Sequence, residues 1–116
     1  MKHASKAKTA VDRSRLADFK SDFFKALANP LRIRILDELR DGEHTVSELK
    51  ERLGVEATNL SQQLAILRAK NMVEGRKQGS NIFYKCTDPA IFELLDVAKK
   101  IFNNQLVGVK RILESL

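Results

Sequence analysis

Residues 56–68, EATNLSQQLAILR, carry several side chains that form hydrogen bonds without carrying charge. At about 100° per helical residue, Thr58, Ser61 and Gln62 fall on one side together with Ala65, and three leucines fall on the other. Hydroxyl and amide groups both donate and accept hydrogen bonds, as the edges of base pairs in the major groove require. The leucine side predicts packing on a core. The polar side predicts a surface that reads DNA bases, with an ordinary solvated helix face as the alternative.

Positive charges follow this stretch and lie around a predicted turn. Arg76 and Lys77 precede the turn and Lys85 follows it. Basic side chains beside a groove-reading helix are placed for contacts with phosphates, which add affinity for DNA of any sequence. A solvated hairpin is the alternative interpretation of each. The candidate DNA-binding residues are Thr58, Asn59, Ser61, Gln62, Gln63, Arg68, Arg76, Lys77, Gln78 and Ser80.

The spacing of apolar residues predicts the helices that position this surface. Predicted helices span residues 13–27, from Pro30 to the glycine at 42, from a Thr45 cap to Gly54, and 56–68. Thr45 and Glu48 form the capping-box pattern, in which each closes a hydrogen bond at the helix start. Gly54 is a helix stop. A helix, a glycine turn and the polar helix in succession predict a helix-turn-helix.

After residue 70 the apolar period changes from that of a helix to that of a strand. The segments MVEGRK and IFYKC predict a two-stranded hairpin around the turn QGSN. Asp88 and Pro89 predict the start of a last helix that runs to the end of the chain, with Asp88 as its cap. The order predicts a mainly α fold with a small β-hairpin, which is a winged helix-turn-helix.

The bulk composition narrows the class of function. A length of 116 residues fits one domain, and a net charge of +6 favours an anionic partner such as nucleic acid. Neither a catalytic Ser/His/Asp set nor a phosphate-binding glycine loop is recognisable, so no enzyme is predicted. One cysteine, no signal peptide and no membrane-spanning run predict a cytoplasmic protein without membrane contact. Residues 1–12 predict a flexible basic arm, and residues 13–116 the folded domain.

Between Phe23 and Asp88 the sequence resembles the ArsR/SmtB family of bacterial winged-helix repressors. The resemblance is clearest in ALANPLRIRIL, NLSQQLAILR and GRKQGSNIFYKC. It implies a homodimer that binds an imperfect inverted repeat in double-stranded promoter DNA and represses transcription until an effector, which the sequence does not identify, releases it. A winged helix used only for protein–protein contact is the alternative function.

The resemblance also implies dimerisation through the first and last helices. Both carry apolar stripes that are long for a chain of this size. The alternative is that the two stripes pack on each other within one chain. The candidate dimer residues are Leu16, Phe19, Phe23, Ile91, Leu95, Ala98, Phe102 and Val109.

Many members of that family sense metals, through a Cys-x-Cys motif on the first helix of the helix-turn-helix or through Asp and His pairs on the last helix. Here the first of these helices, TVSELKERL, has no Cys or His, and the last helix has no His. The remaining imidazole and thiol ligands are His3, His44 and Cys86, which are too scattered for a tetrahedral site. The sequence therefore predicts no metal site and no cofactor. Cys86 is interpreted as a structural thiol and His44 as a loop residue.

Overall fold

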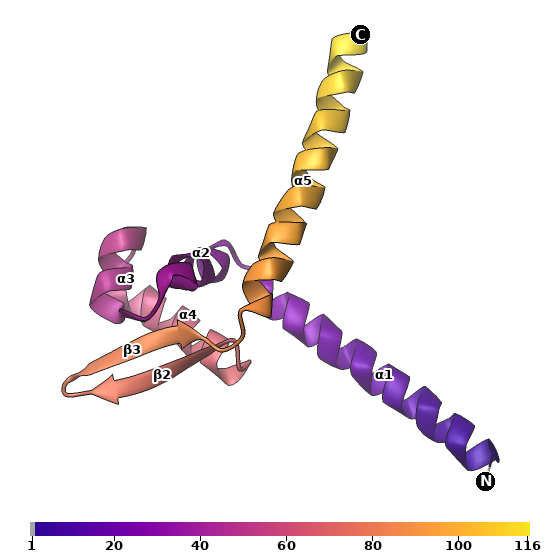
Figure 1. Cartoon of the computed structure of the whole chain (residues 1–116), viewed down its shortest axis with the longest axis horizontal. Helices are drawn as coiled ribbons and strands as arrows, with labels where there is room; N and C mark the ends of the chain where they lie inside the picture. The colour runs from indigo at the N-terminus through magenta and orange to yellow at the C-terminus, as the bar shows by residue number, and fades with distance from the viewer. Residues whose placement is uncertain (1) are drawn as a thin grey trace.

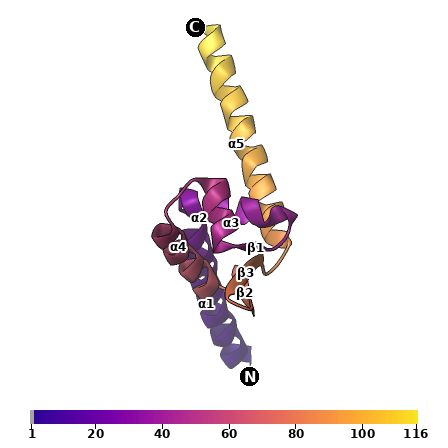
Figure 2. The ribbon, with the colours of Figure 1, turned by 90° about the vertical axis from the view of Figure 1, so that its left-hand side faces the viewer.

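The computed structural model describes the backbone of residues 2–116 and the side chains of residues 12–116. Its elements, in chain order, are α1 (Lys2–Leu27), α2 (Pro30–Glu38), the 3₁₀ helix η1 (Leu39–Asp41), β1 (His44–Thr45), α3 (Val46–Leu53), α4 (Ala57–Ala69), β2 (Val73–Gln78), β3 (Asn81–Cys86) and α5 (Ala90–Ser115). Helices α2, α3 and α4 cluster beside the sheet, and α1 and α5 project away from this body (Figure 1 and Figure 2). The mainly helical winged helix-turn-helix predicted from the sequence is confirmed.

Local signals in the sequence fix both ends of α3. The Thr45 hydroxyl accepts a hydrogen bond from the Glu48 backbone N–H at 3.2 Å, and the Glu48 carboxylate accepts one from the Thr45 backbone N–H at 3.4 Å. Gly54 ends the helix in the left-handed conformation, with φ of 65°. The Arg34 guanidinium donates to the Leu53 carbonyl at 3.0 Å, which satisfies a backbone acceptor at the helix end. The predicted capping box and glycine stop are both confirmed.

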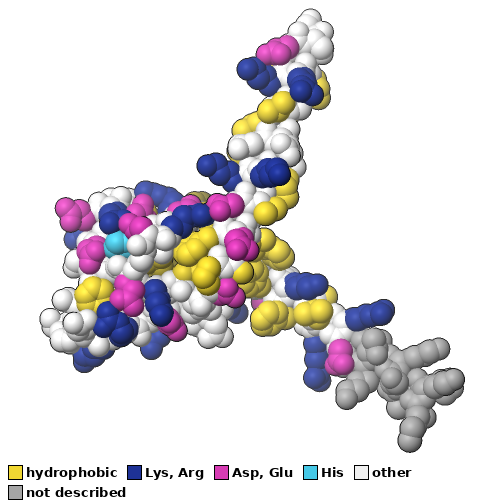
Figure 3. All heavy atoms as spheres, in the orientation of Figure 1, with side chains coloured by type: hydrophobic (Ala, Val, Ile, Leu, Met, Phe, Trp, Pro, Cys, Tyr) yellow, Lys and Arg dark blue, Asp and Glu magenta, His cyan; other side chains and the backbone are white. Residues whose placement is uncertain are grey.

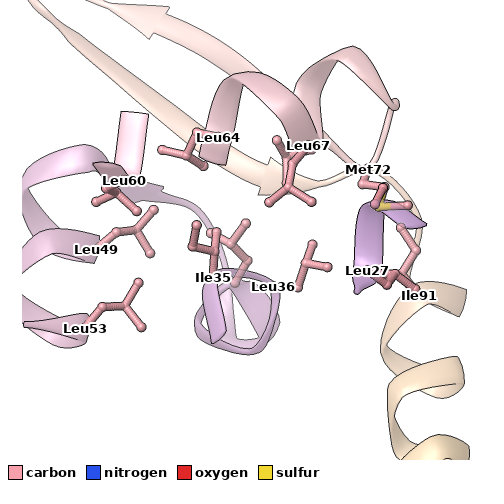
Figure 4. Close-up of a cluster of buried hydrophobic side chains, with 13 residues drawn as sticks. Leu27, Ile35, Leu36, Leu49, Leu53, Leu60, Leu64, Leu67, Met72 and Ile91 are labelled. Atoms are coloured by element: carbon pink, nitrogen blue, oxygen red, sulfur yellow. The ribbon is translucent and has the colours of Figure 1, made fainter. Parts of the chain in front are cut away.

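The leucine side of α4 lies in the core of the domain. Leu60, Leu64 and Leu67 are at most 1% exposed. They meet side chains of α2 and α3, while Leu27 of α1 and Ile91 of α5 close the far end of the cluster (Figure 4). Burying a side chain of this size stabilises the fold by about 1.5–3 kcal/mol. The orientation of α4, and therefore of its polar side, is fixed by this packing.

The wing is a three-stranded antiparallel sheet in the order β1-β3-β2. Strands β2 and β3 form the predicted hairpin, with Arg76 opposite Phe83, and Gly79 lies in the turn with φ of 63°. The two-stranded prediction lacked β1, which pairs His44 with Tyr84 and Thr45 with Phe83. Two residues are too short to show an alternating pattern, because strand signals need a run of about four or more.

Helices α1 and α5 make the chain extended. The radius of gyration is 19.1 Å, whereas a compact chain of this length has about 13 Å. The two helices leave the body in different directions, so their apolar stripes do not cover each other within one chain (Figure 1). The alternative of intramolecular packing is therefore wrong. The N-cap position of α5 is Pro89 and not the predicted Asp88, which lies one residue earlier. The Asp88 carboxylate still accepts a hydrogen bond from the Ala90 backbone N–H, the first of the helix, at 2.9 Å.

The backbone of α1 is helical from Lys2, further toward the N-terminus than the predicted helix 13–27. The side chains of residues 1–11 lie outside the described part of the structure, so the flexible arm 1–12 stays a prediction. No helix in the described part of the chain combines the length and apolarity needed to cross a bilayer.

Candidate nucleic-acid interface

The polar side of α4 faces solvent. A shallow, open depression on the surface is lined by Ala57, Thr58, Ser61, Gln62 and Ala65, and all five are exposed. None of these side chains is charged, and three of them carry hydrogen-bonding groups. The predicted division of α4 into a leucine side and a neutral polar side is confirmed. Such an uncharged surface suits close contact with base edges, because its hydroxyl and amide groups can pair with both the donors and the acceptors that the bases present.

Asn59 and Gln63 lie on another flank of α4. The half-buried Gln63 turns toward α2, where its Oε1 accepts a hydrogen bond from Nη1 of Arg32 at 2.8 Å. Its Nε2 donates to Oδ1 of Asn59 at 3.3 Å. The structure therefore does not bring these two amides together with Gln62, although all three were candidates. Arg32 could not be identified from the sequence, because no local pattern connects it with Gln63, which lies 31 positions further along the chain.

Arg76, the candidate phosphate ligand on β2, already has partners in the free protein. Its Nη2 lies 2.7 Å from Oε2 of Glu43, and its Nη1 donates to Oε1 of Gln78 at 2.7 Å. The guanidinium also lies 5.1 Å from the centre of the Phe83 ring. The hydrogen bond from Arg76 lowers the pKa of Glu43. A phosphate approaching Arg76 has to compete with the Glu43 carboxylate.

The remaining candidate residues, together with Lys85, lie on the wing and near the end of α4. Lys77 and Ser80 are exposed near the hairpin turn, and Lys85 lies 3.1 Å from Glu74. Arg68 borders a second shallow depression, which runs between α4 and Tyr84 of the wing. Basic and acidic side chains are mixed over this end of the molecule (Figure 3).

His44 is buried at the base of the wing, so its interpretation as a loop residue is wrong. Its side chain is 8% exposed, with Nε2 2.6 Å from Asp41 Oδ1 and Nδ1 2.9 Å from Glu48 Oε2. Burial opposes the charged imidazolium, but the hydrogen bonds to Glu48 and Asp41 outweigh burial and raise the pKa of His44. The ring thereby ties η1 to the first turn of α3, where Glu48 also closes the capping box.

These contacts make folding stability depend on pH. A pKa raised in the folded state stabilises it fully below the unfolded value of about 6.5, and the stabilisation is lost as the pH rises through the folded pKa. We expect the free energy of unfolding to fall from pH 6 to pH 9, with a smaller fall in His44→Gln. The lowered pKa values of Asp41 and Glu48 act in a separate, acidic window and stabilise the fold above their unfolded pKa. Urea unfolding of the unmodified protein and of His44→Gln between pH 6 and pH 9 measures how steeply the free energy of unfolding falls in each. An equal fall in the two proteins would contradict the role given to His44.

Cys86, the one thiol among the possible metal ligands, lies at the end of β3. Cys86 is half-buried, and its Sγ lies 3.3 Å from the Asp88 carbonyl. Burial raises the pKa of the thiol, which disfavours the reactive thiolate. Among the side chains that the structure describes, no group of three or more His, Cys, Asp and Glu is arranged to hold a metal ion.

The candidate dimer residues divide into three environments. Ile91 is 6% exposed and belongs to the core of its own chain. Phe23 and Leu95 are half-buried against that core. The remaining candidates are exposed, namely Leu16, Phe19, Ala98, Phe102 and Val109. Figure 3 shows apolar side chains along the projecting parts of both α1 and α5.

A helix-turn-helix with a neutral, hydrogen-bonding second helix and a wing beside it defines a DNA-binding protein of the winged-helix class. Residues 27–76 match the family described as helix-turn-helix domain. The HTH-type transcriptional regulator Rv0081 of Mycobacterium tuberculosis (strain H37Rv) is 42% identical over 102 residues, which cover 87% of this chain and 90% of the relative. The biofilm growth-associated repressor of Xylella fastidiosa (strain Temecula1) is 33% identical over 97 residues, covering 84% and 85%.

Solved structures agree with these relatives. The crystal structure of M. tuberculosis Rv0081 superposes with a TM-score of 0.73 at 43% identity, covering 79% of this chain and 93% of that one. The homodimeric winged helix-turn-helix DNA-binding domain Mb0332 of Mycobacterium bovis, a possible ArsR-family regulator, gives 0.73 at 29% identity, covering 81% and 87%. This chain belongs to the ArsR/SmtB family of winged helix-turn-helix transcriptional regulators. It is therefore a DNA-binding regulator of transcription and not an enzyme.

Proposed function

We propose that this protein is a homodimeric repressor that binds an imperfect inverted repeat in promoter DNA. The observation that carries the proposal is the neutral, solvent-facing side of α4, held in place by three buried leucines. In each subunit this side enters the major groove, where Thr58, Ser61 and Gln62 contact base edges. Lys77 and Arg76 of the wing contact phosphates, Arg76 after exchanging its carboxylate partner for a phosphate oxygen.

The exposed apolar side chains of α1 and α5 support the dimer. Leu16 and Phe19 on α1, and Phe102 and Val109 on α5, are each at least half exposed in the single chain. Large apolar side chains that are exposed in rows along two helices are typical of a protein–protein interface. Pairing two copies through these helices buries the stripes and gives the two-fold symmetry that an inverted repeat requires.

Selection of bound duplexes from random DNA with the purified protein tests the proposal. We expect an inverted repeat whose half-sites lie about one helical turn, or a multiple of it, apart. A gel shift with the selected duplex and with a scrambled duplex of equal composition should separate specific from non-specific binding. A module that serves only protein–protein contact would enrich no sequence.

The proposal includes the absence of a regulatory metal site at the positions used by many family members. The first helix of the helix-turn-helix lacks Cys and His, and the last helix lacks His, so thiolate and imidazole ligands are missing there. We expect stoichiometric zinc, cadmium or arsenite to leave the DNA complex intact in a gel shift. Cys86→Ser is expected to bind DNA nearly as tightly as the unmodified protein. Tight zinc binding in calorimetry, coupled to release of the duplex, would overturn this part.

A further inference from the structure

One guanidinium, that of Arg32 in α2, joins three helices. Its Nε donates to the Ala26 carbonyl at 2.6 Å, and its Nη2 lies 3.4 Å from the Lys25 carbonyl, both at the end of α1. Its Nη1 donates to the Gln63 side chain of α4 at 2.8 Å. A lysine has a single point of charge and cannot reach all three acceptors in this way. The position therefore requires the shape of arginine as well as its charge.

The contact with Arg32 fixes the direction of the amides on α4. A guanidinium only donates hydrogen bonds, so the oxygen of Gln63 has to face it. The nitrogen of Gln63 then points to Asn59 and donates to its oxygen at 3.3 Å. Asn59 is exposed, and because its oxygen accepts this hydrogen bond, its amide nitrogen is the group that is left to donate to an outside partner. The chain from Arg32 through Gln63 thus presents Asn59 to its surroundings as a hydrogen-bond donor.

We propose that Arg32 is a positioning residue for DNA binding, which acts through Gln63 to hold the Asn59 amide nitrogen toward a phosphate oxygen of the DNA backbone. This inference rests on the proposed entry of α4 into the major groove. Asn59 lies in the first turn of α4, outside the depression lined by Thr58, Ser61 and Gln62. A flank residue of a groove-entering helix faces the sugar–phosphate backbone, which offers acceptors and no amide-type donors. A donor facing outward fits that partner, and an acceptor facing outward does not.

The test is a double-mutant cycle on DNA affinity, using the duplex selected from random DNA and a scrambled duplex. Asn59→Ala is expected to weaken binding roughly tenfold, because it removes a hydrogen bond to a charged phosphate. Arg32→Lys and Gln63→Ala should each weaken it roughly three- to tenfold, and should have no further effect in the Asn59→Ala background. Asn59→Asp keeps the shape but offers only oxygen, and should weaken binding more than Asn59→Ala.

A phosphate contact carries no sequence information, so all these variants should lose affinity for both duplexes by the same factor. An equal loss from Arg32→Lys in the Asn59 and the Asn59→Ala backgrounds would overturn the proposal, as would a changed base preference, which indicates a tilted α4. Gln63→Ala gives the same test at a half-buried position if Arg32→Lys unfolds. Thr58→Ala and Gln62→Ala separate the two levels: if they weaken binding while Asn59→Ala does not, only this inference fails.

Discussion

The Phe102→Glu variant is expected to be a monomer of 13.1 kDa under conditions where the unmodified protein has twice that mass. Phe102 is 58% exposed in the single chain, so the isolated fold accommodates a carboxylate there. In a dimer that buries α5, the same carboxylate loses its hydration without gaining a partner, which costs several kcal/mol in each subunit. A micromolar dimer is held by about 8 kcal/mol, so two such penalties abolish it.

Light scattering at micromolar concentration, combined with circular dichroism, measures the mass and the fold of the variant. Asn103→Glu is the matched control, because it adds the same charge about 100° around the helix from Phe102. It should stay dimeric. A monomeric unmodified protein, or a Phe102→Glu variant that remains a dimer, would contradict the assignment of α5 to the interface.

The second large effect is expected at the reading side of α4. Gln62→Ala should cost about 1–3 kcal/mol for each bidentate hydrogen-bonded pair with a base that it removes, and should relax the preference at one base pair in each half-site. Its effect on random DNA should be small, because glutamine carries no charge. The variant keeps the leucine side of α4, so the free energy of unfolding should change little.

Arg76→Ala serves as the contrast to Gln62→Ala. It should weaken binding to the selected and the random duplex alike, and reduce the salt dependence by roughly one unit for each phosphate that a subunit no longer binds. Glu43→Gln, which removes the competing carboxylate while keeping Arg76, should strengthen both. Affinities across a salt series separate these results. Equal losses on both duplexes in Gln62→Ala, or a changed base preference without a changed salt slope in Arg76→Ala, would refute the two roles.

The sequence predicts those parts of the fold whose signals are local. The leucine spacing of α4, the capping box of Thr45 and Glu48, the Gly54 stop and the hairpin turn each lie within a few residues, and the structure confirms all of them. The helix periods also identify the two apolar stripes. The spacing of apolar residues does not predict the direction in which α1 and α5 leave the body. That direction depends on the packing of Leu27 and Ile91 in the core.

The features missed from the sequence are contacts between distant residues. Arg76 and Glu43 are 33 positions apart, and Arg32 and Gln63 are 31 apart, so no spacing rule connects them. Both contacts change the interpretation of a candidate: Arg76 becomes a cation with a competing partner, and Gln63 becomes a support for Asn59. His44 was missed for another reason, because a single histidine in a polar stretch carries no sign of burial.

The most direct test of a two-fold dimer that reads two half-sites is the effect of their spacing on affinity. Inserting about five base pairs, half a helical turn, between the half-sites of the selected duplex turns one of them to the opposite side of the DNA. We expect the affinity then to fall to that of a duplex with a single half-site, while the unmodified spacing binds on the order of a hundredfold more tightly, because the second half-site is then bound within the same complex. Equal affinity for both spacings would contradict a dimer that binds both half-sites at once.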